Sequence, residues 1–169
     1  MKGMDSKKME KGIIQIYYGD GRGKSTAALG NAIHAASEGK NIVIVQFLKG
    51  KMNDEQNFLE RLEPEIKIFR FEKSEESYEE LNEEQKQEAA INIKNGLNYA
   101  RKVLATGECD LLVLDEILGV IDNGLVSKED IKDVIDAKSD EADLILTGRV
   151  LDDELREYAD EIYKIVSEK

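Results

Sequence analysis

The sequence is poor in the residues on which disulfide-bonded and zinc-binding proteins depend. Its 169 residues include one cysteine, Cys109, and one histidine, His34. A lone cysteine cannot form a disulfide within the chain. One cysteine and one histidine are also fewer than the four ligands of the usual zinc site. A Ser-His-Asp triad would likewise depend entirely on His34. The single thiol fits a reducing compartment, so we expect a cytoplasmic protein.

Basic residues are outnumbered, and long apolar runs are missing. The 24 Lys and Arg against 36 Asp and Glu give a formal net charge of -12. Proteins that bind nucleic acid need surplus positive charge against the phosphate backbone, so the balance argues against that class. A small anionic ligand is still possible, because it responds to local rather than net charge. Since no apolar run approaches the roughly 20 residues of a membrane span, we expect no membrane partner.

Signs of a domain boundary are also scarce. Proline occurs once, at Pro64, and no Gly/Ser-rich linker divides the chain. We therefore expect one domain over residues 12–169, a size that buries about 70% of its unfolded surface without disulfides or metal. Residues 1–11 are polar and mixed in charge, so we expect a flexible N-terminal segment and no signal peptide.

What the sequence does have is a regular alternation of strand-like and helix-like segments. Clusters of β-branched and aliphatic residues predict strands at 13–18, 42–47, 66–71, 111–114, 144–146 and 161–166. Apolar residues at helical spacing predict helices at 24–38, 54–62, 83–105, 127–137 and from Asp152. This alternation predicts an α/β fold of three layers, with a mainly parallel sheet of about six strands.

Details of three predicted helices can also be read from the sequence. Asn82 with Gln85 three residues later resembles a capping box, and Ser127 is a candidate cap for the helix that follows it. Five residues of the first helix are expected on its inward face. They are Ala28, Leu29, Ala32, Ile33 and Ala36.

A glycine-rich stretch joins the first expected strand to the first expected helix. It consists of Gly19, Asp20, Gly21, Arg22, Gly23, Lys24, Ser25 and Thr26. Glycines in this position let backbone N–H groups converge on an anion, and the helix N-terminus adds partial positive charge. In such a P-loop the lysine neutralises a phosphate and the serine hydroxyl serves Mg²⁺. The stretch predicts a P-loop NTPase-like fold that binds ATP, with a plain glycine-rich turn as the alternative.

The loop is one residue shorter than the usual P-loop. The position of the usual first glycine is occupied by Tyr18, so the pattern is Gly-x-Gly-x-Gly-Lys-Ser-Thr. This shortening argues against an ordinary phosphotransferase.

Acidic residues follow one of the buried strands. Asp115 and Glu116 come directly after 111–114. Ligands of parallel sheets gather at the carboxyl ends of the strands, so both carboxylates should face the same crevice as the loop. One of them is expected to hold Mg²⁺ directly or through water, and a helix-capping role is the alternative.

Four further polar residues are weaker candidates for contacts with the nucleotide. Gln46 and Lys49 follow the second strand, and Arg149 follows the fifth, where its guanidinium suits phosphate. Solvation of Lys49 and a surface salt bridge of Arg149 are the alternatives. His34 lies ten residues after Lys24, about 15 Å along the helix, which suits the far end of a nucleotide or plain solvent exposure.

These segments together resemble the P-loop cob(I)alamin, or corrinoid, adenosyltransferases. Four pieces match in order, and the resemblance covers roughly residues 11–166. They are Gly19 to Thr26 followed by Ala27-Ala28, Val45 to Gly50, Leu112 to Glu116, and Leu146 to Arg149.

The resemblance implies a specific reaction. In this family Mg-ATP binds across the loop, Co(I) of a reduced corrinoid attacks the ribose 5′ carbon, and triphosphate leaves whole. Carried over by position, residues 19–26 would cradle the triphosphate and Lys24 would offset its charge. Ser25 with Glu116, together with Asp115, would serve Mg²⁺. The resemblance further implies a homodimer and an electron-donating reductase as partner.

Two other functions stay open at this point. One is a P-loop phosphotransferase or ATPase that cleaves the γ-phosphate. The other is a non-catalytic regulator that binds ATP or corrinoid, because the chain has no tryptophan and some members of the family place one near the corrinoid. The products formed from ATP distinguish all three.

Overall fold

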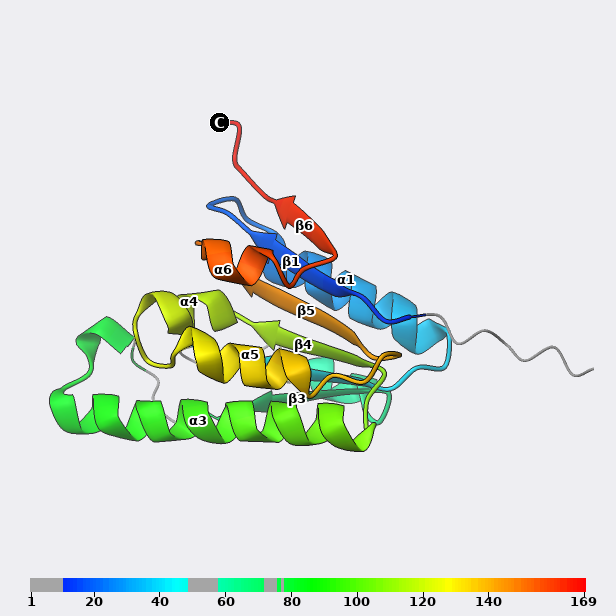
Figure 1. The fold of residues 1–169 in the computed structure, drawn as a ribbon, viewed down its shortest axis with the longest axis horizontal. Coiled ribbons are helices and arrows are strands. Elements are labelled where there is room, and N and C mark those ends of the chain that lie inside the picture. The colour runs from blue at the N-terminus through cyan, green and yellow to red at the C-terminus, as the bar shows by residue number, and fades with distance from the viewer. Residues whose placement is uncertain (1–10, 49–57, 72–75, 77) are drawn as a thin grey trace, which may run out of the picture.

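Six parallel strands form one sheet, in the order β3-β2-β4-β5-β1-β6, in a computed structural model that describes residues 11–48, 58–71, 76 and 78–169. The strands are β1 (Ile14–Tyr18), β2 (Ile42–Gln46), β3 (Ile66–Arg70), β4 (Leu111–Asp115), β5 (Asp143–Gly148) and β6 (Glu161–Lys164). The helices are α1 (Lys24–Ser37), α3 (Glu83–Thr106), α4 (Ile117–Asp122), α5 (Lys128–Asp136) and α6 (Asp153–Arg156) (Figure 1).

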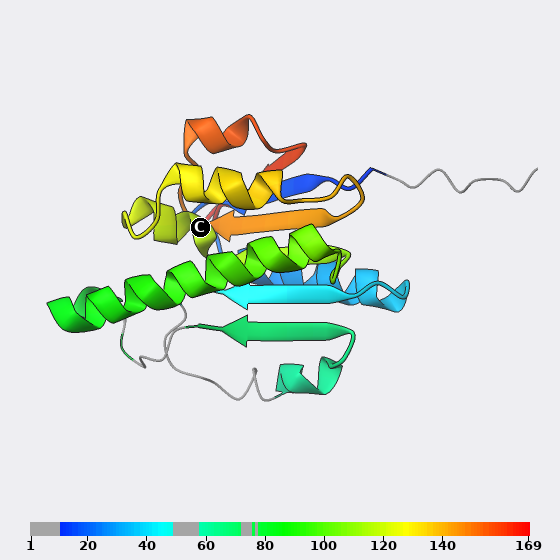
Figure 2. The ribbon, with the colours of Figure 1, turned by 60° about the horizontal axis from the view of Figure 1, so that its bottom comes forward.

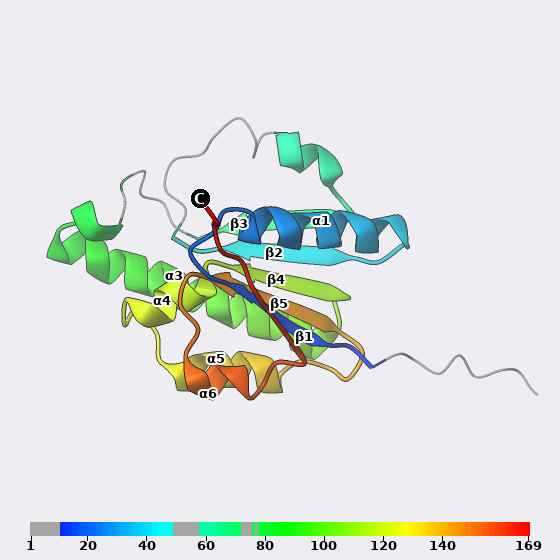
Figure 3. The same cartoon turned by 90° about the horizontal axis from the view of Figure 1, so that it is seen from above.

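Helices cover both faces of the sheet. Figure 3 shows α1 on one side and α3, α4, α5 and α6 on the other. Two apolar cores result, one between the sheet and α1, the other between the sheet and the opposite helices. Every residue of β4 is buried, which explains why its first four residues are all apolar. Within the described ranges, no helix is both long enough and apolar enough to cross a membrane.

The predicted α/β fold with a parallel sheet is confirmed. Each strand lies within two residues of its predicted bounds, as do the helices α1, α3 and α5. Both predicted caps are also present. The Asn82 side chain accepts a hydrogen bond from the Gln85 N–H, and the Ser127 hydroxyl accepts one from the Asp130 N–H.

One local prediction was wrong, one helix was missed, and parts of two predicted segments lie outside the described residues. Ile33 is 47% exposed, because five residues of helix turn it about 140° away from the buried Ala28. The helix α4, directly after Glu116, was missed. Of the helix expected at 54–62, residues 54–57 lie outside the described part, Phe58 and Leu59 are helical as predicted, and Glu60–Leu62 form a 3₁₀ turn. Residues 1–10 of the expected N-terminal segment also lie outside it.

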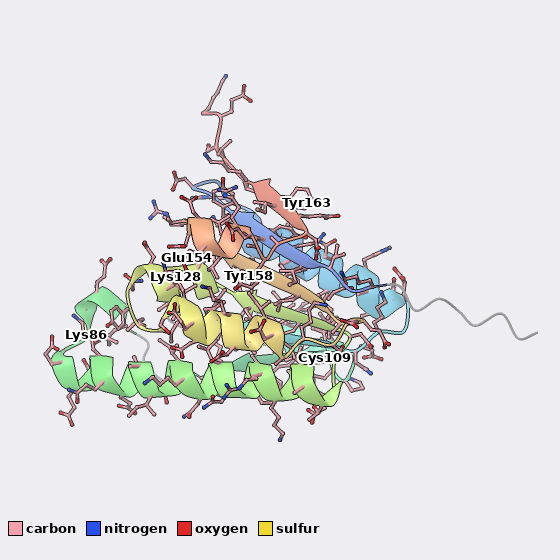
Figure 4. All side chains as sticks on the ribbon, in the orientation of Figure 1. Lys86, Cys109, Lys128, Glu154, Tyr158 and Tyr163 are labelled. Atoms are coloured by element: carbon pink, nitrogen blue, oxygen red, sulfur yellow. The ribbon has the colours of Figure 1, made fainter. Side chains whose placement is uncertain are left out.

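Ion pairs attach the short helix α6 to α5. The Glu154 carboxylate lies 3.2 Å from Lys128 Nζ and 3.0 Å from Lys132 Nζ, and Lys128 also lies 3.4 Å from Asp152. Figure 4 shows Lys128 and Glu154 side by side where these helices meet. Because each of these side chains is at least one quarter exposed to solvent, the pairs orient α6 and add little to the stability of the fold.

Cys109, labelled in Figure 4, lies just after α3, and the burial of its thiol can be tested chemically. Burial, followed by the negative charges of Asp110 and Glu108, raises its pKa from 9.0 to about 12. Since the thiolate is the reactive form, alkylation by iodoacetamide at pH 8 should be ~1,000-fold slower in the native protein than in urea. Mass spectrometry follows the single adduct, and equal rates in both states would contradict a buried Cys109.

Candidate active site

The glycine-rich loop runs from the end of β1 into the first turn of α1. Gly19 and Gly23 have φ angles of 123° and 106°, in the region that favours glycine. Gly23 is also the N-cap of α1, and no acidic residue lies in the first turn. Gly23 has no side chain with which to cap the first backbone N–H groups of α1, so this helix end is suited to bind an anion from outside.

The loop is held in place by two segments that come late in the chain. The Gly19 N–H donates to the carbonyls of Gly148 and Arg149, and the Gly21 N–H donates to the Ile165 carbonyl at 2.9 Å. A Cβ at Gly19 would lie 2.2 Å from the Ile165 oxygen, so only glycine fits there. The loop therefore depends on the end of β5 and on the residues that follow β6.

Lys24 folds back over this loop. Its Nζ donates a hydrogen bond of 2.7 Å to the Gly21 carbonyl. The ammonium group is therefore held at the loop, beside the N-terminus of α1, where positive charge from both sources adds. This is the position from which a lysine can neutralise a bound phosphate.

Three hydroxyl and carboxyl groups meet beside the loop. Ser25 Oγ and Thr147 Oγ1 donate to the same oxygen of Asp115, Oδ1, at 2.7 and 2.8 Å. Thr147 Oγ1 also accepts a hydrogen bond of 2.8 Å from the Glu116 N–H. Asp115 is 2% exposed and Thr147 is fully buried. The cluster joins α1, β4 and β5 through one buried and two partly buried hydrogen bonds, and such bonds are stronger than in water.

The oxygen groups of this cluster fit a magnesium ion. Hard cations prefer carboxylate and hydroxyl oxygens, and Ser25 and Asp115 present one of each within 2.7 Å of one another. Among the described residues no group of three or more His, Cys, Asp or Glu side chains could hold a metal alone. Any remaining ligands would then come from phosphate and water, as is usual for Mg²⁺.

Glu116 differs from its neighbour in backbone and exposure. It has a φ of 65° and forms the N-cap of α4, while Asp115 still belongs to β4. Its side chain is half-buried. Of the two predicted acids, Asp115 is the one whose carboxylate accepts a bond from Ser25.

A polar row continues along the carboxyl edge of the sheet. Arg70, Gln46 and Asp115 are in register across β3, β2 and β4. The Arg70 Nε donates to the Gln46 Oε1 at 2.9 Å. Gln46 therefore lies at the end of the second strand, as predicted, and the structure places it next to the acidic strand. Lys49 lies outside the described residues.

Two predicted residues lie outside this cluster, Arg149 beside the loop and His34 away from it. The Arg149 guanidinium pairs with the Asp20 carboxylate at 3.1 Å, and both side chains are largely exposed. The pair connects the end of β5 to the loop. His34 lies further along α1, where its Nε2 is 2.9 Å from the Glu38 carboxylate and its side chain is 77% exposed.

The helix α3 extends beyond the carboxyl ends of the strands (Figure 2). Its 24 residues span about 36 Å, against about 17 Å for a five-residue strand. Lys86 in the projecting part lies 5.5 Å from the centre of the Tyr78 ring. Further along, Tyr99 packs against Phe69 and Phe71, with ring centres 4.7 and 5.8 Å apart. This projecting part of α3, the overhang, extends past the sheet edge on which the polar row lies.

Sequence reasoning gave no site role to two residues of this region. Thr147 interrupts an apolar strand with a hydroxyl, and a buried hydroxyl has to find hydrogen-bond partners. That rule could have singled it out. Arg70 carries no such signal, because a charged residue at a strand end is most often solvated.

The sequence matches the profile of one protein family over residues 10–169, described as ATP:corrinoid adenosyltransferase BtuR/CobO/CobP. The corrinoid adenosyltransferase CobA of Salmonella typhimurium is 31% identical over 157 residues, covering 92% of this chain and 77% of that protein. The corrinoid adenosyltransferase of Pseudomonas aeruginosa is 27% identical over 160 residues, covering 90% and 74%.

A solved structure of a KaiC-like protein from Pyrococcus horikoshii OT3 has a TM-score of 0.49 and 21% identity, covering 84% of this chain and 63% of that one. The two structures are only distantly similar. The family profile, by contrast, spans the loop, the acidic strand and the end of β5. The predicted resemblance is confirmed, and the chain belongs to the ATP:corrinoid adenosyltransferase family.

Proposed function

We propose that this chain transfers the 5′-deoxyadenosyl group of Mg-ATP to Co(I) of a reduced corrinoid and releases triphosphate. The observation that carries the proposal is the 2.7 Å hydrogen bond from Ser25 to Asp115, directly beside the glycine-rich loop. The bond brings together the hydroxyl and carboxyl groups that an Mg-ATP site would need, in a chain of this family.

The bonds and electrons of the reaction balance without a proton transfer. Co(I) supplies an electron pair to the ribose 5′ carbon and becomes Co(III) bound to carbon. The bond between that carbon and its oxygen breaks, and its electrons leave with the triphosphate. The nucleophile belongs to the substrate, so the protein's share is to orient the reactants and to stabilise charge on the leaving group.

Each part of the site has a role in this proposal. Residues 19–26 and the N-terminus of α1 would bind the triphosphate, and Lys24 would balance the charge that develops as it leaves. Ser25 and Asp115, with Glu116 beside them, would hold Mg²⁺. When bound, Mg²⁺ neutralises phosphate oxygens and so makes triphosphate a better leaving group. Arg149 would contact the phosphates by giving up its ion pair with Asp20 and binding a phosphate group instead.

The family match, rather than the geometry, disfavours γ-phosphate cleavage. Transfer to water needs a group that orients or deprotonates the water. Gln46, next to Asp115 on the sheet edge, and the half-buried Glu116 are groups of that kind. An attack by Co(I) needs no such group, so the products formed from ATP distinguish the two reactions.

The second substrate and the partners complete the proposal. The overhang of α3 and the nearby rings of Phe69 and Phe71 would border the corrinoid above the sheet edge. A reductase would supply the electron that makes Co(I). A homodimer and a cytoplasmic location are expected on the family resemblance and on the single thiol.

The products of the reaction provide the test. The protein is mixed with Mg-ATP and chemically reduced corrinoid, the corrinoid spectrum is followed, and the phosphates are separated by ion exchange. We expect one triphosphate for each adenosylated corrinoid, and no consumption of ATP when the corrinoid is omitted. Release of ADP and phosphate without corrinoid, at about 1 s⁻¹ or faster, would establish the phosphotransferase instead. Bound but unchanged ATP would indicate the regulator.

A further inference from the structure

Thr147 makes two hydrogen bonds with opposite roles at the centre of the cluster. Its hydroxyl donates to Asp115 Oδ1 and accepts from the Glu116 N–H, each at 2.8 Å. A threonine hydroxyl has a single hydrogen to donate, so that hydrogen is committed to Asp115. The side chain is fully buried, and water cannot replace either bond.

The first of these bonds fixes the Asp115 carboxylate. Ser25 and Thr147 approach the same oxygen from different elements, α1 and β5. Because β5 lies between β4 and β1 in the sheet, Thr147 stands between the acidic strand and the strand that leads into the loop. The two hydroxyls therefore set the orientation of the carboxylate relative to the loop.

The second bond fixes the backbone at Glu116. A φ of 65° is unfavourable for a residue with a side chain and persists only where the surroundings hold it. The Glu116 N–H is held by Thr147. One hydroxyl thus controls the direction of both acids, one through its carboxylate and the other through its backbone.

We infer that Thr147 is a positioning residue of the metal–nucleotide site, which aligns Asp115 and Glu116 toward the metal that accompanies ATP. The inference rests on the proposed function only for the identity of the nucleotide. Valine has nearly the same shape as threonine but can neither donate nor accept. Thr147→Val would therefore leave the Asp115 carboxylate with one hydroxyl donor fewer and remove the partner of the Glu116 N–H.

The test is the binding of ATP by calorimetry, in Mg²⁺ and in EDTA, without corrinoid. In Mg²⁺, Thr147→Val should raise the Kd for ATP ~10- to 100-fold, the usual effect of losing a group that orients a metal ligand. In EDTA its Kd should equal that of the wild type. Thr147→Ser keeps the hydroxyl and should bind like the wild type in both conditions. Leu146→Val, a buried change on the same strand, controls for altered packing.

Two results would overturn the inference. An equal rise of the Kd in Mg²⁺ and in EDTA would assign Thr147 to the fold alone, and an unchanged Kd in both would leave it without a role. Should Thr147→Val not fold, Thr147→Cys replaces it, because a thiol is a weak donor of similar size. No corrinoid is present, so the result does not depend on which bond of ATP the protein breaks.

Discussion

Replacing Lys24 with alanine should lower kcat/KM for ATP about 30- to 1,000-fold, which corresponds to ~2–4 kcal/mol of transition-state stabilisation. Lys24 Nζ is held at the loop by the Gly21 carbonyl, beside the positive end of α1. The triphosphate gains negative charge as it leaves the ribose carbon, so the loss should be larger in kcat than in the Kd for ATP. Steady-state kinetics at saturating corrinoid measure the first quantity, and calorimetry measures the second.

The matched control is Lys102→Ala, which removes an exposed lysine from the last turns of α3. It changes the net charge by the same amount, far along α3 from its overhang. We expect it to keep the kinetics of the wild type. Near wild-type kcat/KM in Lys24→Ala would remove the loop from the site.

The second large effect is expected for Asp115→Asn. This exchange keeps the shape of the side chain but removes its charge from the buried cluster with Ser25 and Thr147. The kcat/KM should fall about 100-fold or more, which corresponds to several kcal/mol of lost charge stabilisation by the metal. The Mg²⁺ concentration for half-maximal activity should rise. Titrations of activity with Mg²⁺ measure both quantities.

Glu116→Gln provides the comparison for the second acid. Its side chain is only half-buried and lies at the start of α4, so activity should fall less, while the need for Mg²⁺ still rises. Asp136→Asn, exposed at the end of α5, should change neither. If Glu116→Gln lost activity while Asp115→Asn kept it, Glu116 would be the main ligand and Asp115 a structural acid.

The layers of the fold could be predicted from the sequence because burial leaves a periodic signal. β4, buried on both faces, reads as a continuous apolar run, and the 24 residues of α3 repeat the helical spacing many times. The six-residue α4 is too short for such a repeat. It begins at a left-handed Glu116, a conformation that sequence preferences would assign to glycine.

The site could be predicted only where a motif or the family resemblance carries it. The loop, Ser25 and the acidic pair follow from the glycines and from the position after a strand. The bonds among them depend on the order of strands, since Thr147 reaches Asp115 only because β5 is the neighbour of β4. The order of the strands in the sheet cannot be read from the order of the residues along the chain. The helical spacing of apolar residues was also insufficient for Ile33, because α1 buries only a narrow stripe against the sheet, with Ala28 and Ala32 as its buried residues.

The placement of β1 between β5 and β6 has a consequence for the order in which the protein is assembled during synthesis. The first strand to leave the ribosome pairs with two of the last, and its contacts with them span 130 and 146 residues. Such distant pairings form slowly and late. The Gly21 N–H finds its partner, the Ile165 carbonyl, only after β6 has been made. The nascent chain therefore contains the residues of the glycine-rich loop long before the loop is folded. ATP can bind to the loop, and so stabilise the fold, only at the final step.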